Sequence, residues 1–301
     1  MNCTTSIFII IIMKAKINLV LFFALLSVST SSIIARLLPE VSAVVIAFWR
    51  LSVASILLWA YTAFFPQSSI KKKTFKYYFL SGMFLALHFT TFYGAVKLTS
   101  IANATLLGIT APMFTIIYER LILKRPLKSI IFLGFVIAGT GTIIITGSGL
   151  FLNDGSLFGK FLGLLAALCI SLVYIFASKL REHSNTILYT RTLYSIGAVF
   201  LIIFSVIGKE NVFLISINQI PWLIALGVIP TILGHSLFYY SIKFTSPTIV
   251  ASVPIGEPII ASLFAWILFS EGLPYITFLG GVFILVGVYF LVTHSPRAQN
   301  G

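Results

Sequence analysis

The chain has 301 residues, of which 59% are hydrophobic and only 9% are charged, and no polar stretch is long enough to form a soluble domain. This composition predicts an integral membrane protein rather than a soluble globular one. The formal net charge of +13 does not indicate nucleic-acid binding, because the chain offers no soluble basic element that could read a groove.

Apolar runs of about 20 residues recur along almost the whole length, and each can span a hydrocarbon core roughly 30 Å thick. These runs lack the alternating pattern of barrel strands, so we expect helices. The predicted fold class is all-α, with ten transmembrane helices at 17–38, 41–65, 77–97, 98–123, 128–149, 158–180, 188–207, 220–242, 245–269 and 273–292.

The two ends of the chain are predicted to be short tails, residues 1–12 and 295–301. The apolar run from Ile7 to Ile12 is too short to span a membrane and follows no basic segment, which argues against a cleaved signal peptide. Met13, followed by Lys14 and Lys16, looks like a better translation start than Met1, although both starts stay open. The two cysteines suggest neither a disulfide framework nor a metal site.

Lysines and arginines are distributed unevenly among the predicted loops. With ten spans, most of them fall on the side of the N-terminus, including the run Lys71–Lys73. The positive-inside rule then places both termini in the cytoplasm, and we expect a bacterial cytoplasmic (inner) membrane. The Lys71–Lys73 run would anchor this face and attract anionic membrane lipid.

The sequence also contains an internal repeat. A constant shift of 146 residues superimposes Lys97 on Lys243, Thr99 on Thr245, Ser100 on Ser246 and Pro112 on Pro258. We therefore expect two repeats, 13–149 and 150–294, with five spans each. Because five is odd, the second copy enters the membrane upside down, and inverted repeats of this kind allow alternating access around a midplane cavity.

Enzyme signatures are weak or absent. The segment Gly155–Lys160 resembles a phosphate loop, but it has three residues between its glycines where four are needed, and Phe161 stands where a Ser or Thr should be. The zinc motif His-Glu-x-x-His and the nucleophile elbow Gly-x-Ser-x-Gly do not occur. We expect no catalytic residues, no metal and no cofactor.

Glu257 is the clearest candidate for a functional residue. An ionised side chain at a helix centre costs roughly 2.5–3.5 kcal/mol, so such residues usually face a cavity or a partner. Glu257 lies between Pro254 and Pro258, and prolines free backbone carbonyls, so irregular helix is expected here. The equivalent position in the first repeat is Ala111, beside Pro112. We expect Glu257 to sense a proton or a cationic substrate; a neutral Glu bonded between helices is the structural alternative.

Arg50, within the second span, is the next candidate. Its guanidinium presents several N–H donors in one plane, and this geometry matches the carboxylate of Glu257 or of a substrate. An equally good interpretation is that the Arg50 side chain extends to the membrane interface and bonds the ends of neighbouring helices. Arg191, in the corresponding seventh span, is expected to be a structural anchor.

His88 and His235 form a near-symmetric pair, at a shift of 147 residues. Tyr239, four residues after His235, shares its helix face. Asn103 and Thr110 put a polar stripe on span four. We expect His88, His235, Tyr239 and Asn103 to line the cavity, although each can also bond a neighbouring helix. Glycines at 134, 139, 141, 280, 281 and 287 predict close helix packing or a homodimer face.

These residues resemble a known family. The segment from His88 to Pro112, with Lys97-Leu-Thr-Ser, and the segment from Gly234-His235 to Glu257-Pro258, with Lys243-Phe-Thr-Ser, resemble the two halves of an EamA-type member of the drug/metabolite transporter (DMT) superfamily. Trp49-Arg50 and Glu271 look like further family features. Where the family pattern places an acid after span four, this chain has Arg125-Pro126.

The resemblance implies a ten-helix fold with inverted five-helix repeats, a central cavity and the movement of small metabolites, often outward. We expect a secondary transporter that exports an amino acid or derivative, with a proton or another ion as the coupling partner. An intramembrane enzyme or a lipid-handling protein that uses the same cavity stays open as the alternative, because a fold alone does not choose a function.

Overall fold

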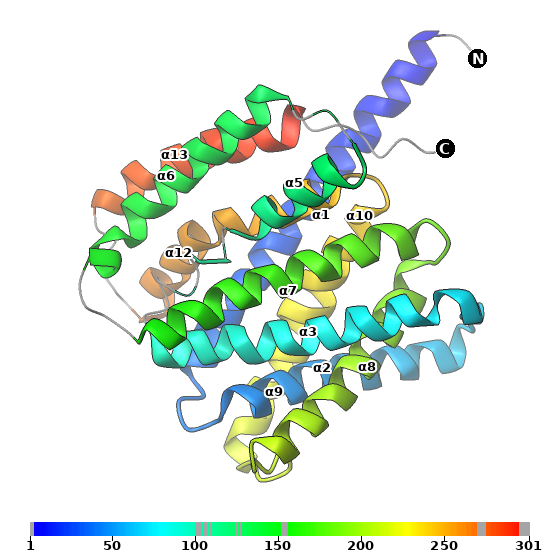
Figure 1. The fold of residues 1–301 in the computed structure, drawn as a ribbon, viewed down its shortest axis with the longest axis vertical. Coiled ribbons are helices and arrows are strands. Elements are labelled where there is room, and N and C mark those ends of the chain that lie inside the picture. Colours follow the sequence, from blue (N-terminus) through cyan, green and yellow to red (C-terminus); the bar gives the residue numbers. More distant parts are fainter. Residues whose placement is uncertain are drawn as a thin grey trace.

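The computed structural model describes residues 3–99, 104, 107, 108, 110–124, 126, 128–151, 156–269 and 275–294, which form a bundle of helices (Figure 1). The α-helices are α1 (Cys3–Arg36), α2 (Ala43–Phe64), α3 (Lys72–Leu98), α5 (Ala111–Leu121), α6 (Ser129–Phe151), α7 (Leu157–Arg181), α8 (Thr186–Ile207), α9 (Ile220–Leu226), α10 (Ser236–Ile242), α11 (Pro247–Ser252), α12 (Glu257–Phe269) and α13 (Tyr275–His294). Two short 3₁₀ segments, η1 (Ile217–Gln219) and η3 (Val253–Gly256), and a π-helical segment, η2 (Gly227–His235), complete the described helices.

Within the described part of the chain, six helical stretches are long and apolar enough to cross a membrane: Ala15–Arg36, Ala43–Phe64, Lys72–Leu98, Leu157–Arg181, Thr186–Ile207 and Ile217–Ile242. Each overlaps one predicted span. Shorter apolar stretches, Ser129–Ile144, Pro247–Gly256 and Phe278–Leu291, lie in the predicted spans five, nine and ten. A helical fold with several membrane-spanning helices is therefore confirmed, whereas ten spans and the side of the termini stay predictions.

Helices at equivalent places in the two halves of the chain contact each other. α2 packs on α8, α5 on α11 and α6 on α13, which pairs the predicted spans two with seven, four with nine and five with ten. Two other contacts join unlike places in the two halves, because α3 packs on α7 and α1 packs on η2; α3 also packs on α8. A two-fold relation between the halves would produce this pattern, since it exchanges span three with span eight and span six with span one.

Glycines let α6 and α13 approach closely along one edge of the molecule (Figure 1). A Cβ atom added to Gly287 would lie 2.4 Å from the backbone nitrogen of Ala138, and one added to Gly141 would lie 2.5 Å from the carbonyl oxygen of Gly280. Gly134 is similarly close to the backbone of Gly287. These glycines pack two helices of the same chain, which is one of the two uses that their positions predict.

Prolines interrupt the helices around the middle of the bundle. Pro254 is the second residue of the 3₁₀ segment η3, which separates α11 from α12, and Pro112 lies in the first turn of α5. Pro258 belongs to α12, but its side chain lies outside the described part of the chain. The π-helical segment η2, which contains Pro230, is an irregularity that the sequence analysis did not predict. Its wider turns free backbone carbonyls that side chains can use.

Candidate functional site

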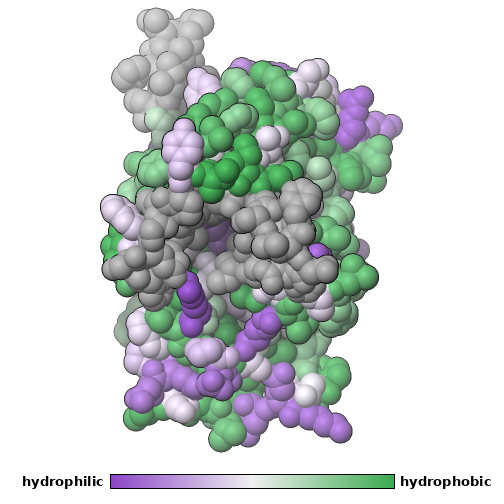
Figure 2. All heavy atoms as spheres, turned by 90° about the vertical axis from the view of Figure 1, so that its left-hand side faces the viewer, coloured by the Kyte–Doolittle hydropathy of each residue, from purple (hydrophilic) through white to green (hydrophobic). Residues whose placement is uncertain are grey.

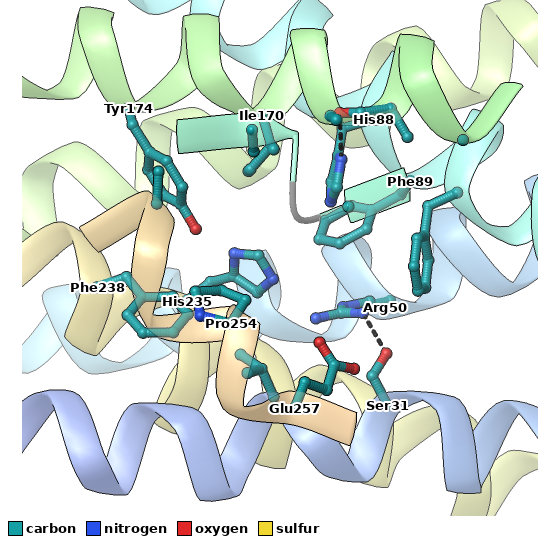
Figure 3. Close-up of a pocket in the computed structure, with 18 residues that line it drawn as sticks. Ser31, Arg50, His88, Phe89, Ile170, Tyr174, His235, Phe238, Pro254 and Glu257 are labelled. Carbon is teal, nitrogen blue, oxygen red and sulfur yellow. Dashed lines mark hydrogen bonds between the residues drawn. The ribbon is translucent and has the colours of Figure 1, made fainter. Parts of the chain in front are cut away.

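A cavity of about 90 Å³ lies in the interior of the bundle. Its size suits a small ligand, because pockets for drug-sized molecules hold roughly 300–1,000 Å³. Both halves of the chain contribute side chains, and the residues labelled in Figure 3 are Ser31, Arg50, His88, Phe89, Ile170, Tyr174, His235, Phe238, Pro254 and Glu257.

Arg50 is a buried cation whose hydrogen-bond partners among the described residues are all neutral. Its side chain is 1% exposed, and its guanidinium carbon lies 4.1 Å from the ring centroid of Phe89. The guanidinium donates four hydrogen bonds: Nε to Thr231 Oγ1 (2.8 Å), Nη1 to Ser31 Oγ (2.7 Å) and to Tyr93 Oη (2.9 Å), and Nη2 to the Pro230 carbonyl (3.3 Å). A guanidinium has five N–H groups, so one N–H of Nη2 has no acceptor among the described residues. Arg50 therefore joins α1, α3 and η2 at the cavity instead of reaching the membrane interface.

Glu257 enters the cavity from the start of α12, directly after the 3₁₀ segment. Its carboxylate points toward Arg50 (Figure 3). Among the described residues, no donor makes a hydrogen bond to this carboxylate, and none of the four Arg50 bonds ends on it. The site therefore contains one cation and one carboxyl group that face the same cavity without being joined. A polar ligand bound in this cavity would lie against both groups.

The two predicted histidines lie side by side at the cavity, with ring centroids 6.4 Å apart. Nδ1 of His88 lies 2.9 Å from the carbonyl oxygen of Ala166, and because a carbonyl only accepts, this nitrogen carries the proton. The other ring nitrogen of His88 is left for the cavity. His235 packs edge-on against Phe89, and its buried Nδ1 has no hydrogen-bond partner among the described residues.

Tyr239 does not line the cavity; it packs against His235, which does. Its ring packs against His235 at 6.2 Å and against Tyr189 at 5.2 Å, and it is fully buried. Together with Tyr174 and Tyr194 these tyrosines form a buried group, here named the tyrosine layer: Tyr174, Tyr189, Tyr194 and Tyr239. Only Tyr174 of this layer contacts the cavity.

The other predicted residues are distributed as follows. Asn103 lies outside the described residues, so its predicted place at the cavity is not tested. Ala111, which precedes Pro112, lines the cavity together with Pro254. Arg191 lies away from the cavity, over the ring of Trp59.

Three residues of the site were missed by the sequence analysis: Ser31, Tyr93 and Thr231, which hold Arg50. Ser31 belongs to the run Ser29–Ser32, a cluster of hydroxyl groups inside an otherwise apolar span. That run is a detectable signal, because four adjacent polar residues are unusual in a lipid-facing helix. Tyr93 and Thr231 carry no comparable signal in the sequence.

Comparison with known proteins agrees with this architecture. The EamA-like transporter family matches the chain twice, at residues 15–147 and 157–293. An uncharacterized transporter of Clostridium kluyveri is 26% identical over 211 residues, which cover 68% of each chain. One of Archaeoglobus fulgidus is 26% identical over 210 residues, covering 68% of this chain and 72% of the relative. The uncharacterized transporter YdfC of Bacillus subtilis is 26% identical over 196 residues, or 64% of this chain and 63% of the relative.

One protein of known crystal structure superimposes with a TM-score of 0.75 at 13% identity, covering 92% of this chain and 96% of that chain. At this identity the likeness shows the fold alone. The family match, by contrast, covers both halves of the sequence and includes the segments that carry Arg50, His88, His235 and Glu257. The chain belongs to the EamA-like transporter family, and it is a membrane transporter of this kind.

Proposed function

We propose that this transporter moves a small zwitterionic metabolite, such as an amino acid or a derivative, out of the cell across the cytoplasmic membrane. The observation that carries the proposal is the pair of opposite charges at one cavity. Arg50 keeps one N–H without an acceptor among the described residues, and Glu257 presents a carboxyl group that receives no hydrogen bond from them.

A zwitterion matches both groups at once. Its carboxylate would accept from Arg50, since guanidinium and carboxylate are complementary in shape, and its ammonium would donate to Glu257. Burying a ligand with a single charge would leave one of these two groups uncompensated in an apolar surrounding, which is costly. The rings of Phe89, Phe92 and Phe238 leave an apolar surface for the body of the ligand.

The structure supports access from one end of the bundle at a time. Beyond the cavity, α7 continues from Tyr174 to Arg181, about 10 Å farther along the helix axis. Buried Arg181 donates from Nε to the Tyr239 carbonyl (3.1 Å) and from Nη2 to Thr186 Oγ1 (2.7 Å). The tyrosine layer and Arg181 therefore close this end. Figure 2 looks onto the opposite end, where α7 begins, and shows hydrophilic atoms near the centre of this face.

We propose ten spans in two inverted repeats, with both termini in the cytoplasm. The symmetric pairing of α2 with α8, α5 with α11 and α6 with α13 supports this arrangement. If the two halves exchange conformations, the closed end opens and the open end closes around the same cavity. A gradient would supply the energy, and Glu257 is the group proposed to exchange a coupling proton with the substrate. His88 and His235 would bind the polar part of the ligand.

Counterflow in proteoliposomes tests this proposal. Vesicles are loaded with a mixture of unlabelled amino acids, and the uptake of each labelled amino acid is measured. We expect uptake of at least one amino acid, and we expect Glu257→Gln to reduce it at least tenfold while the protein still folds. Glu182→Gln removes the same charge from an exposed loop residue and is the matched control, with uptake unchanged.

Two outcomes would contradict the proposal. Unchanged transport by Glu257→Gln would remove this residue from the mechanism. Conversion of a substrate by the protein in detergent, where no sealed compartment exists, would favour an enzyme, because transport has no meaning without two compartments.

A further inference from the structure

Arg191 is a cation within a membrane-crossing helix, and no acidic side chain among the described residues forms an ion pair with it. Its Nη1 donates to Thr62 Oγ1 at 2.8 Å, and this is its one hydrogen bond among the described residues. Its Nε is buried and has no hydrogen-bond partner there. Charged side chains within spans are normally paired, because an unpaired charge is costly in an apolar medium. An anion from outside the chain would complete this site.

The surroundings hold the guanidinium of Arg191 at the outer surface of the bundle. Its central carbon lies 3.9 Å from the ring centroid of Trp59, so the planar group stacks on the indole. Trp59 is itself anchored, because its Nε1 donates to Ser195 Oγ at 2.9 Å and Ser195 bonds Ser55 at 2.8 Å. The indole is nevertheless 52% exposed, and the lipid-facing side chains of the same two helices are apolar, including Ile56 and Val199. The site therefore opens sideways, toward lipid.

The depth of the site fits a phospholipid headgroup. Arg191 is five residues from the start of α8, and Trp59 is five residues from the end of α2, so both lie about 7 Å inside their helices. Trp is enriched at this level of a bilayer. The exposed lysines Lys71–Lys73 belong to the same end of the bundle and attract anionic lipid to this leaflet.

We propose that Arg191, Trp59 and Thr62 form a binding site for the phosphate of an anionic phospholipid. The guanidinium edge matches phosphate oxygens as a two-pronged donor, and the indole keeps that edge aimed at the bilayer. The site lies between α2 and α8, which belong to different halves of the chain, so a bound lipid would also hold the two halves together here. This inference does not depend on the substrate of the transporter.

The test is lipid binding by the purified, delipidated protein in detergent, followed by native mass spectrometry and thermal unfolding. The probes are phosphatidylglycerol, phosphatidylcholine and inorganic phosphate. We expect phosphatidylglycerol to bind and to raise the melting temperature by several degrees, with a smaller effect of phosphatidylcholine. Arg191→Gln should weaken the binding of phosphatidylglycerol at least tenfold. Lys209→Gln, which removes one exposed positive charge just beyond the other end of α8, should change it less than twofold.

If Arg191→Gln does not fold, Trp59→Leu gives an independent test, because it keeps the charge and removes the indole surface that orients it. We expect this variant to lose most of the lipid-specific stabilisation. Wild-type affinity in both variants overturns the proposal, as does equal stabilisation by phosphatidylglycerol and phosphatidylcholine. Stabilisation by inorganic phosphate alone, at the level that phosphatidylglycerol produces, would mean a site for a soluble anion and would overturn the lipid assignment.

Discussion

Arg50 in α2 and Thr231 in η2 are joined by a hydrogen bond of 2.8 Å from Nε to Oγ1, although they lie 181 positions apart in the sequence. Thr231 donates in turn to the carbonyl of Leu226, five residues earlier, at 2.8 Å. A threonine in a π-helical turn therefore supports its own irregular backbone and the buried cation of the other half. The bond links the two repeats at the cavity.

Replacing Thr231 by Val should destabilise the protein. Valine has nearly the same shape but cannot accept from Arg50, so a buried guanidinium N–H loses its partner. The expected loss is about 1–3 kcal/mol in the free energy of unfolding, measured by thermal or denaturant unfolding in detergent. Thr140→Val, at an exposed position of α6, is the control and should cost less than about 0.5 kcal/mol. Equal stability of the two variants would contradict this role.

Arg50→Lys should reduce transport even though it keeps the charge. A lysine ammonium donates from one atom and cannot reach the hydroxyls of Ser31, Tyr93 and Thr231 together with a substrate carboxylate. We expect transport in proteoliposomes to fall at least tenfold, which corresponds to about 1.4 kcal/mol in binding. The same exchange at exposed Arg120 should leave transport unchanged. Normal transport by Arg50→Lys would show that charge alone is sufficient.

Gly287→Ala should separate α6 from α13. The added Cβ would lie 2.4 Å from the backbone nitrogen of Ala138, and backbone atoms cannot move aside as a flexible side chain can. Overpacking of this kind costs about 1–3 kcal/mol or more. Gly139→Ala is the matched control, because a Cβ there meets no atom within 4 Å. The measurement is the melting temperature of Gly287→Ala and of Gly139→Ala. Equal values for the two variants would refute the close contact between α6 and α13.

His88→Asn separates the structural from the ligand-binding role of this histidine. The amide of asparagine can take the place of Nδ1 and donate to the Ala166 carbonyl, while the second ring nitrogen is lost from the cavity. We expect near-normal stability and roughly a tenfold weaker substrate affinity, the effect of losing about one good hydrogen bond. His88→Leu should impair both properties. Unchanged affinity in His88→Asn would assign His88 to packing alone.

The candidate residues that could be predicted from the sequence share one property. Glu257, Arg50, His88 and His235 are costly to place in lipid, so their positions inside apolar spans are conspicuous. The structure brings these four together around one cavity. The hydroxyl groups of Ser31 and Thr231 cost little in a helix, because they can bond a carbonyl of their own turn, and the sequence does not show that both also accept from Arg50.

Helical periodicity predicts which side chains share a helix face, but not which of them reach the cavity, and Tyr239 is an example. The four-residue spacing correctly places it beside His235, at 6.2 Å between ring centroids. Whether Tyr239 lines the cavity, however, depends on the position of Tyr174 in α7, and helix packing sets that position. The π-helical turn likewise escaped prediction, since Pro230 is equally compatible with a kinked α-helix.

Sequence patterns alone predict that the chain is helical, that it belongs in a membrane and that it is built from two related halves. These features follow from local apolar content and from a constant shift of residue types, which need no knowledge of contacts. Which polar groups meet, by contrast, depends on how the helices pack. The partners of Arg50 come from α1, α3 and η2, and helix pairing rather than chain order sets those distances.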